Sequence, residues 1–241
     1  KLPLTKAGKI LYETMSVIRN DEEIMIKRMQ EKQSTIELVL GVTLTAGEYA
    51  LAKPLSVFLN KHPEMNMHII YGNAEQLLAK LDNGEIHFAL IEGYFPSHKY
   101  EQLLYYTDSF ICVCAKNHTF SNKVNHIEDL LNERILIRET GSGTRDLLDS
   151  YLKTYNLSYL DFKNHLEIES ISSIISLLKN DCGISFLYRL SVEEELKNGS
   201  LKEIKIQNLQ LHHDTTFLWN KNSVYSKQYN EICKELIGGF N

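Results

Sequence analysis

The hydrophobic positions follow a helical period in the first 33 residues and a different pattern afterwards. Apolar residues recur at alternating spacings of four and three from residue 11 to residue 29, which predicts one helix over residues 5–33, with Thr5 able to cap its start. The apolar stripe is narrow, of heptad type, and has one polar break at Glu22. Such a stripe favours pairing with another helix, and packing on its own domain is the alternative. The predicted pairing residues are Leu11, Met15, Ile18, Met25 and Met29.

After Ser34, apolar runs of strand length alternate with amphipathic helical segments. Strands are predicted at residues 36–42, 67–71, 86–91, 110–115, 134–138, 165–168, 183–187 and 214–219. Helices are predicted at 46–61, after a capping box formed by Asn73 and Gln76, and at 144–155, 171–179 and 224–237. This order contains two β-α-β-α-β halves, and each half requires parallel strands joined by right-handed crossovers. The pattern therefore predicts an α/β fold built from two similar halves.

Composition restricts the class of protein. Of the 241 residues, 43% are apolar and 24% are charged, as in an ordinary globular protein, and the net charge of −5 argues against nucleic-acid binding by bulk electrostatics. No apolar run approaches the about 20 residues that span a bilayer, so we expect no membrane association. The four cysteines lack metal-ligand spacing, which favours reduced, structural thiols and no bound metal. A redox sensor that uses Cys112 or Cys182 is the alternative.

Hydroxyl and small side chains recur where the predicted strands lead into helices. In parallel sheets, ligands bind beyond the carboxyl ends of the strands, where helix N-termini favour anions. The turns concerned contain Thr43 and Thr45, then Asn73, then residues 138–145, and then Ser170. Plain helix capping is the alternative at each turn, because Ser, Thr and Asn commonly cap helices. Their recurrence at four turns favours a binding site for a small polar molecule.

The turn at 138–145 is the most informative of the four. Gly141 and Gly143 let the backbone come close to a ligand, and Ser142 and Thr144 supply hydroxyl groups at a helix start. No Gly-Lys-Ser/Thr follows, so this segment is not a phosphate-binding P-loop.

No catalytic constellation accompanies these turns. Gly-x-Ser-x-Gly is absent, and the adjacent histidines at 212 and 213 would face opposite sides of a strand. Glu92 and Glu139 end predicted strands and could form an acid–base pair, although salt-bridged or solvated glutamates are the more usual case. We therefore expect neither an enzyme nor a bound cofactor.

Three segments resemble the LysR-type transcriptional regulators. Leu4-Thr5-Lys6-Ala7-Gly8 is similar to the signature that opens the linker helix of that family. Residues 138–145, Arg-Glu-Thr-Gly-Ser-Gly-Thr-Arg, are similar to a turn of its regulatory domain, and residues 178–187 are similar to a glycine-containing segment late in that domain. The family often has proline where this chain has Tyr188, which affects the local turn but not the fold.

The resemblance implies a cytoplasmic bacterial regulator with two Rossmann-like subdomains of periplasmic-binding-protein type, joined by two crossover strands. It implies a linker helix at 1–34, a first subdomain at 35–112 and 218–241, and a second subdomain at 113–217. It further implies that a small-molecule effector binds between the subdomains of a dimer or tetramer, which holds promoter DNA through an N-terminal domain preceding Lys1. By position, the effector-contacting turns of the family match Thr43, Thr45, Asn73, Thr140, Ser142, Gly143 and Ser170, and Arg138 would add a charge for an anionic effector.

Two other classes of protein remain. A solute-binding protein of the same fold, serving a transporter, is expected to have a leader or lipid anchor and no heptad helix, and the sequence shows the reverse. A small-molecule enzyme on a related two-lobed fold would need a convergent acid, base or nucleophile, which the sequence does not provide.

Overall fold

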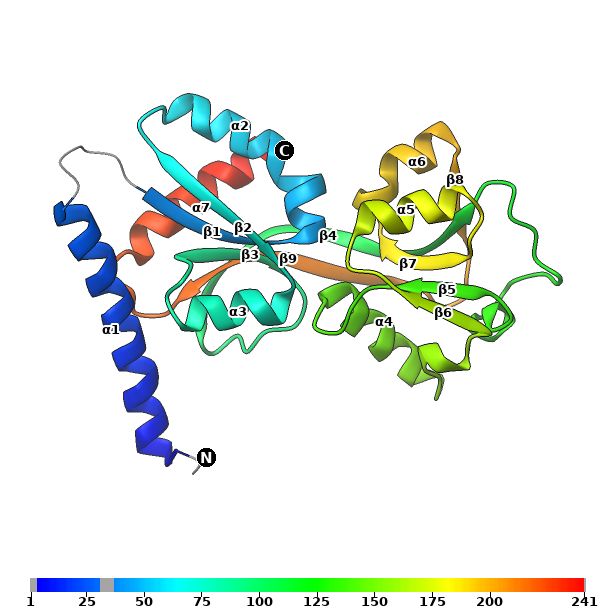
Figure 1. Cartoon of the computed structure of the whole chain (residues 1–241), viewed down its shortest axis with the longest axis horizontal. Helices are drawn as coiled ribbons and strands as arrows, with labels where there is room; N and C mark the ends of the chain where they lie inside the picture. The colour runs from blue at the N-terminus through cyan, green and yellow to red at the C-terminus, as the bar shows by residue number, and fades with distance from the viewer. Residues whose placement is uncertain (1–3, 31–36, 241) are drawn as a thin grey trace. The chain divides into compact units, whose positions relative to one another are not determined.

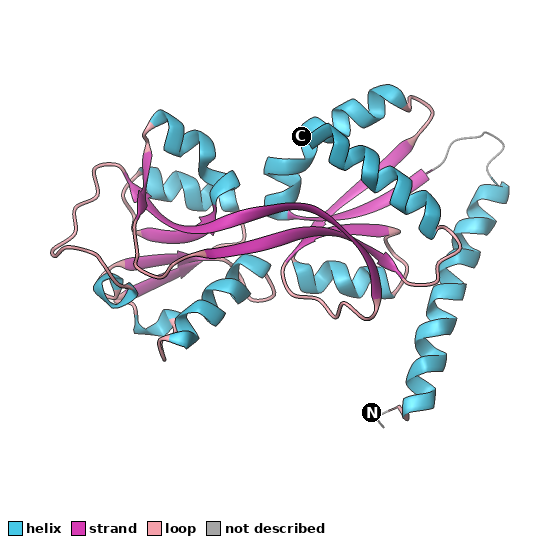
Figure 2. Ribbon diagram, turned by 180° about the vertical axis from the view of Figure 1, so that it is seen from behind, coloured by secondary structure: helices cyan, strands magenta, loops and turns pink. Residues whose placement is uncertain are grey.

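The chain forms two compact units in the computed structural model, which describes residues 4–30 and 37–240 (Figure 1). Unit 1 comprises Lys1–Ile91, Phe95–Tyr105 and Thr216–Asn241, and unit 2 comprises Glu92–Tyr94 and Tyr106–Thr215. Two long neighbouring strands contribute residues to both units (Figure 2): they are β4 (Tyr100–Ala115) and β9 (Leu211–Asn220). The subdomain boundaries predicted from the sequence fall within these same two strands.

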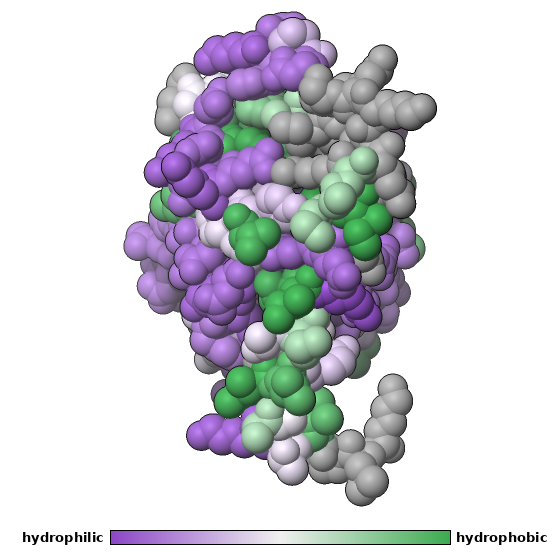
Figure 3. Space-filling view, turned by 90° about the vertical axis from the view of Figure 1, so that its left-hand side faces the viewer, coloured by the Kyte–Doolittle hydropathy of each residue, from purple (hydrophilic) through white to green (hydrophobic). Residues whose placement is uncertain are grey.

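Helix α1 (Lys6–Gln30) presents its predicted apolar stripe to solvent. The five predicted pairing residues are between 48% and 78% exposed. Figure 3, which views the side of the molecule that is on the left in Figure 1, shows hydrophobic residues on this surface. Residues 31–33 of the predicted helix lie outside the described residues. Neither α1 nor any other helix in the described ranges combines the length and the apolar character that a membrane crossing requires. Pairing of α1 with another helix stays a prediction.

A different face of α1 is anchored to unit 1. The Asp21 carboxylate accepts hydrogen bonds from the Ser223 hydroxyl and from Val224 N, both at 2.8 Å. Asn20 is buried, and its amide, turned to suit its neighbours, accepts from Gly84 N at 3.1 Å. Ile24, one turn further along, is also buried. The helix therefore packs on its own unit through one short patch while its apolar stripe stays exposed.

Unit 1 contains the first parallel set of strands. β1 (Glu37–Thr43) pairs with both β2 (Asn66–Gly72) and β3 (Phe88–Glu92), and all three run parallel. Helix α3 lies on one face, and α2 and α7 pack together on the other (Figure 1). The core lies between sheet and helices, with Leu77 and Leu81 of α3 spaced four residues apart as a buried helical face requires. The helices of unit 1 are η1 (Ala46–Leu51), α2 (Ala52–Lys61), α3 (Ala74–Asp82) and α7 (Ser226–Phe240).

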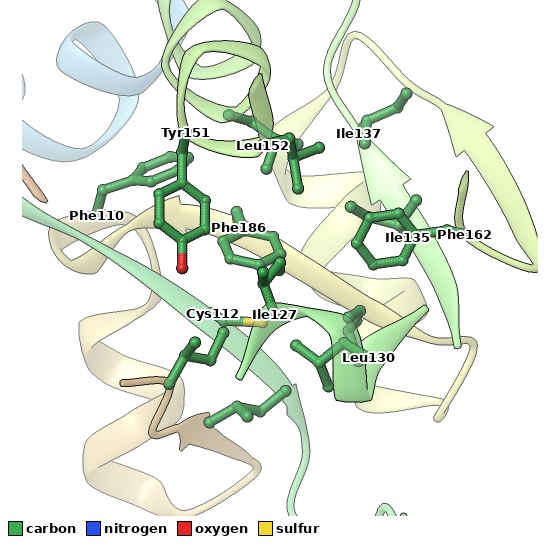
Figure 4. Close-up of a cluster of buried hydrophobic side chains, with 14 of the residues drawn as sticks. Phe110, Cys112, Ile127, Leu130, Ile135, Ile137, Tyr151, Leu152, Phe162 and Phe186 are labelled. Carbon is green, nitrogen blue, oxygen red and sulfur yellow. The ribbon is translucent and has the colours of Figure 1, made fainter. Parts of the chain in front are cut away.

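Unit 2 contains the second parallel set. β5 (Arg134–Ile137) pairs in parallel with β6 (Asn164–Glu167) and with β7 (Ile184–Tyr188), while β8 (Leu201–Ile204) runs antiparallel to β4. Figure 4 shows the core beneath α4, where Tyr151 and Leu152 pack with side chains of β4, β5 and β7. The helices and helical turns of unit 2 are η2 (Ile127–Leu130), α4 (Gly143–Thr154), η3 (Tyr159–Asp161), α5 (Ile171–Lys179), η4 (Arg189–Val192) and α6 (Glu193–Asn198).

The structure confirms the predicted α/β fold with two crossover strands. Hydrogen bonds join eight of the described strands in the order β2-β1-β3-β9-β4-β7-β5-β6, and β8 pairs with β4 outside this path. Several local features were not predicted, among them the first ten residues of β4, because that strand was expected only at 110–115. The helix expected at 46–61 begins with a π-helical segment, and the segment 193–204 forms α6 and β8, although its charged sequence carries little hydrophobic periodicity.

Candidate functional site

In unit 1, the turn after β1 buries two threonines. Thr43 ends the strand and Thr45 precedes η1, and both side chains are almost fully buried. The Thr45 hydroxyl makes no capping bond, and its oxygen has no hydrogen-bond partner among the described residues. A buried hydroxyl without a partner costs about 1–3 kcal/mol, so it indicates a ligand or an ordered water at this helix start.

The second turn of unit 1 is explained by capping. Asn73 Oδ1 accepts a hydrogen bond from Gln76 N at 2.9 Å, and Gln76 Oε1 accepts one from Asn73 N at 3.2 Å. The predicted capping box is therefore confirmed, and it satisfies backbone N–H groups at the start of α3. A role for Asn73 in ligand binding stays a prediction, for which the geometry provides no separate support.

In unit 2, the buried hydroxyl groups of the turn between β5 and α4 do not cap the helix. Gly141 has a φ of 87°, in the left-handed region that glycine adopts without strain. Ser142 stands at the N-cap of α4 and is buried, yet its side chain makes no capping hydrogen bond. The Thr144 oxygen is buried and has no hydrogen-bond partner in the described part of the chain. Thr140, by contrast, is exposed at the rim of the turn.

Gly143 brings the start of α4 against the backbone of Glu92 and Gly93. A Cβ atom added at Gly143 would lie 2.2 Å from Glu92 O and 2.8 Å from Gly93 Cα. Any other residue would push the helix away, because these neighbours are backbone atoms that a side-chain rotation cannot move. The sequence predicted that Gly143 permits a close approach, and the approach seen in unit 2 is to the chain's own backbone.

The two buried arginines of this turn are already paired. Arg138 donates to both carboxylate oxygens of Glu139, at 2.8 Å and 3.0 Å. Arg145 donates to Asp149 at 2.9 Å, to Glu167 at 3.2 Å and to the backbone oxygen of Arg138 at 2.9 Å. Arg138, expected to add a charge for an anionic ligand, is thus neutralised by its neighbour. Glu139 is salt-bridged, which was the alternative to an acid–base role.

The fourth turn again caps its helix. Ser170 Oγ accepts a hydrogen bond from Ser173 N at 3.2 Å at the start of α5. The four turns therefore divide into two kinds: Asn73 and Ser170 cap helices, whereas Thr45, Ser142 and Thr144 make no such bond. Capping is therefore shown at Asn73 and Ser170, whereas ligand binding at Thr45, Ser142 and Thr144 stays a prediction.

Tyr188 lies at the same edge of unit 2 and was not predicted to belong to the site. It ends β7, which runs parallel to β5, so it lies at the edge of the sheet from which α4 begins. The side chain is 2% exposed, and its hydroxyl has no hydrogen-bond partner within the described ranges. Burial, and next the charge of Glu92, raise the pKa of this phenol well above its ordinary value, so it stays protonated. Only the pairing of distant strands reveals this position, so no local signal in the sequence marks it.

The cysteines provide neither a metal site nor a reactive buried thiolate. No cluster of His, Cys, Asp and Glu among the described residues could hold a metal ion. Cys112, Cys114 and Cys233 are buried, and Cys182 is partly exposed. Burial raises the pKa of Cys114 to about 11 and holds those of Cys112 and Cys233 well above the ordinary value. A protonated, buried thiol is a poor nucleophile, so of the two candidate redox cysteines only Cys182 is accessible.

Known proteins place the chain in one family. The model of the LysR substrate binding domain matches residues 31–237. A probable RuBisCO transcriptional regulator of Chlorokybus atmophyticus is 26% identical over 243 residues, which cover 98% of this chain and 78% of that protein. Its counterpart in Gracilaria tenuistipitata var. liui is 25% identical over 244 residues, which cover 98% and 79%. The solved regulatory domain of Synechocystis PCC6803 CcmR, in complex with 2-PG, is 20% identical, with a TM-score of 0.73 over 85% of this chain and 97% of that chain.

The match to the family model spans most of the chain, and the relatives match nearly all of it. The fold of unit 1 and unit 2 agrees with that of a solved regulatory domain. The chain therefore belongs to the LysR family, as the effector-binding part of a LysR-type transcriptional regulator.

Proposed function

We propose that the chain senses a small polar metabolite at the helix starts that follow β1 and β5. The supporting observation is that Thr45 and Thr144 each place a buried hydroxyl without a partner, among the described residues, at a helix N-terminus. Backbone N–H groups and the positive end of the helix dipole favour polar or anionic ligand atoms there. Thr43 lies in the turn of unit 1, and Thr140, Ser142 and Gly143 lie in the turn of unit 2.

The remaining predicted contacts carry less support. Asn73 and Ser170 use their side-chain oxygens to cap α3 and α5, and Arg138 is held by Glu139. The proposal includes no catalytic step, because the candidate acid or base Glu139 is engaged in that ion pair. It also includes no cofactor.

Isosteric substitutions separate binding from capping. Thr45→Val and Thr144→Val each remove a hydroxyl and keep the shape, so each should weaken the affinity for a bound metabolite on the order of fivefold to tenfold. The melting temperature should not fall, because a buried hydroxyl without a partner is replaced by a methyl group. Isothermal titration calorimetry of the whole chain against a metabolite panel provides the measurement.

Ser170→Ala is the matched control. It removes a cap, so it should lower stability by about 1 kcal/mol and leave the affinity unchanged. If both threonine variants bind as tightly as the unaltered chain, the proposed site is wrong.

LysR-type regulators bind small-molecule effectors, form oligomers and bind promoter DNA through an N-terminal domain. We infer that this chain does the same in the cytoplasm, as a dimer or tetramer paired through the exposed stripe of α1. Replacing Leu11 and Met15 by Glu should shift the oligomer toward monomer in analytical ultracentrifugation, because the two charges would face each other across a helix pair. An unchanged sedimentation coefficient would place the oligomer contact elsewhere.

A ligand biases a conformational equilibrium only through its different affinities for the two states. We propose that the effector does so in this chain, and that the change reaches α1 through the contacts that Asp21 and Asn20 make with unit 1. Hydrogen exchange of α1 with and without effector tests this link, and equal protection in both states would exclude it.

A further inference from the structure

Acidic and aromatic groups gather beside the start of α4 in unit 2. Glu92 and Tyr188 are buried, whereas Tyr94 is exposed. The imidazole of His213 meets the rings of Tyr94 and Tyr188 at steep angles, with centroids 5.3 Å and 6.4 Å apart. Carboxylates and aromatic faces both attract cations. The electrostatic preference of this cluster is therefore opposite to that of the helix N-terminus next to it.

The cluster and the helix start lie in one place. Gly143 packs directly on the backbone of Glu92, so the first turn of α4 and the end of β3 are in contact. Tyr188 ends a strand parallel to β5, from which the chain passes into α4. The charge of Glu92 also contributes, after burial, to the raised pKa of Tyr188.

Two hydroxyl groups at this place have no hydrogen-bond partner within the described residues. They are Tyr188 Oη and Thr144 Oγ1, and both side chains are more than nine-tenths buried. Ser142, on the same turn, makes no capping hydrogen bond with its hydroxyl group. Native proteins rarely bury such groups unpaired, so the pair indicates a molecule that supplies the missing partners.

Cations of unit 2 near this place are already matched by carboxylates. Arg138 is held by Glu139, and Arg145 by Asp149 and Glu167. A dianionic ligand would therefore be repelled by the Glu92 carboxylate, while both arginines of this turn are already engaged in ion pairs. A ligand with one negative and one positive end would satisfy both the helix start and the carboxylate.

We propose that the effector is a zwitterion of the amino-acid class, whose carboxylate binds the Ser142–Thr144 turn and whose ammonium group faces Glu92 and the Tyr188 oxygen. This inference rests on the proposed function and narrows the chemical class of its ligand. Glu92 and Tyr188 are then the residues that select an amine over a hydroxyl group.

The test uses ligand pairs that differ only at the selected group. The whole chain is titrated calorimetrically with the twenty standard amino acids and, for each that binds, with the 2-hydroxy acid of the same side chain. Inorganic sulfate represents the dianions. The expected result is that at least one amino acid binds on the order of 10- to 100-fold more tightly than its hydroxy acid, as a charge-assisted hydrogen bond requires.

Two variants assign the preference to the named residues. Glu92→Gln keeps the shape and removes the charge, so it should abolish the preference for the amino acid. Tyr188→Phe should weaken amino-acid binding about tenfold without lowering the melting temperature, because the lost hydroxyl had no partner within the protein. Tyr151→Phe is the control, since its hydroxyl lies in the core beneath α4 (Figure 4), and it should bind as the unaltered chain does.

The outcomes distinguish this inference from the proposed function. If sulfate or a hydroxy acid binds as tightly as any amino acid, or if no amino acid binds, the zwitterion is refuted while the sensing function can still hold. Unchanged binding in both Glu92→Gln and Tyr188→Phe refutes the assignment as well. If Thr45→Val and Thr144→Val leave the binding of every ligand unchanged, the proposed site itself fails.

Discussion

Replacing Gly143 by Ala tests the contact on which the geometry of α4 depends. The added Cβ would lie 2.2 Å from Glu92 O and 2.8 Å from Gly93 Cα, so the helix start must move by about 1 Å to reach an ordinary separation. Strain of this kind costs about 1–3 kcal/mol. The higher helix propensity of Ala, up to about 1 kcal/mol, offsets part of it at most.

The expected result is a lower melting temperature. At this chain length 1 kcal/mol corresponds to about 2–4 °C, so Gly143→Ala should lower it by about 2–10 °C in differential scanning calorimetry. Gly238→Ala is a control with the opposite sign, because nothing lies within 4 Å of the added Cβ in helix α7. It should raise the melting temperature by about 1–4 °C through helix propensity alone. If Gly143→Ala melts at or above the temperature of the unaltered chain, α4 does not pack on Glu92 and the reasoning fails.

Three further measurements address other parts of the chain. Asp21→Ala should speed hydrogen exchange in α1, since it removes two 2.8 Å hydrogen bonds. The control Arg19→Ala changes an exposed residue of the same helix and should leave the exchange unchanged. Equal exchange rates in the two variants would contradict the anchor. The hydrogen bond to Glu235 raises the pKa of His62, so this pair stabilises the fold below about pH 6.5 and its contribution is lost as pH rises through the raised pKa. His62→Gln should therefore cost less than about 1 kcal/mol at pH 5.5 and nothing at pH 9, and a loss that does not depend on pH would refute this. Under native conditions iodoacetamide should modify Cys182 before the three buried cysteines, as mass spectrometry can show.

Local signals in the sequence predicted the elements well. The capping box at Asn73 depends on residues three apart, so it could be recognised from sequence and is confirmed. The alternation of strands and helices predicted the two parallel sets because buried strands and amphipathic helices have different periods. By contrast, α6 and β8 carry mostly charged residues, and their structure depends on packing against neighbours that the sequence does not mark.

The candidate site was harder to predict, because its character depends on contacts between distant segments. The sequence marked the hydroxyl residues of the turns, but it could not show that Ser170 makes a capping hydrogen bond whereas Ser142 and Thr144 make none. Arg138 was expected to add a charge for an anionic effector, and the sequence did not show that it pairs with its neighbour Glu139. Contact between Arg138 and an effector stays a prediction. Tyr188 enters only through the pairing of β7 with β5, almost fifty residues apart.

The anchor of α1 has a mechanical consequence. Lys6 precedes Asp21 by 15 residues, so about 22 Å of helix extends beyond the hydrogen bonds to Ser223 and Val224. A rigid rod held near one end magnifies rotation: a tilt of about 5° at the anchor moves the far end by about 2 Å at that helical length. An adjustment within unit 1 too small to rearrange its core would thus displace the far end of the helix by more than the length of a covalent bond.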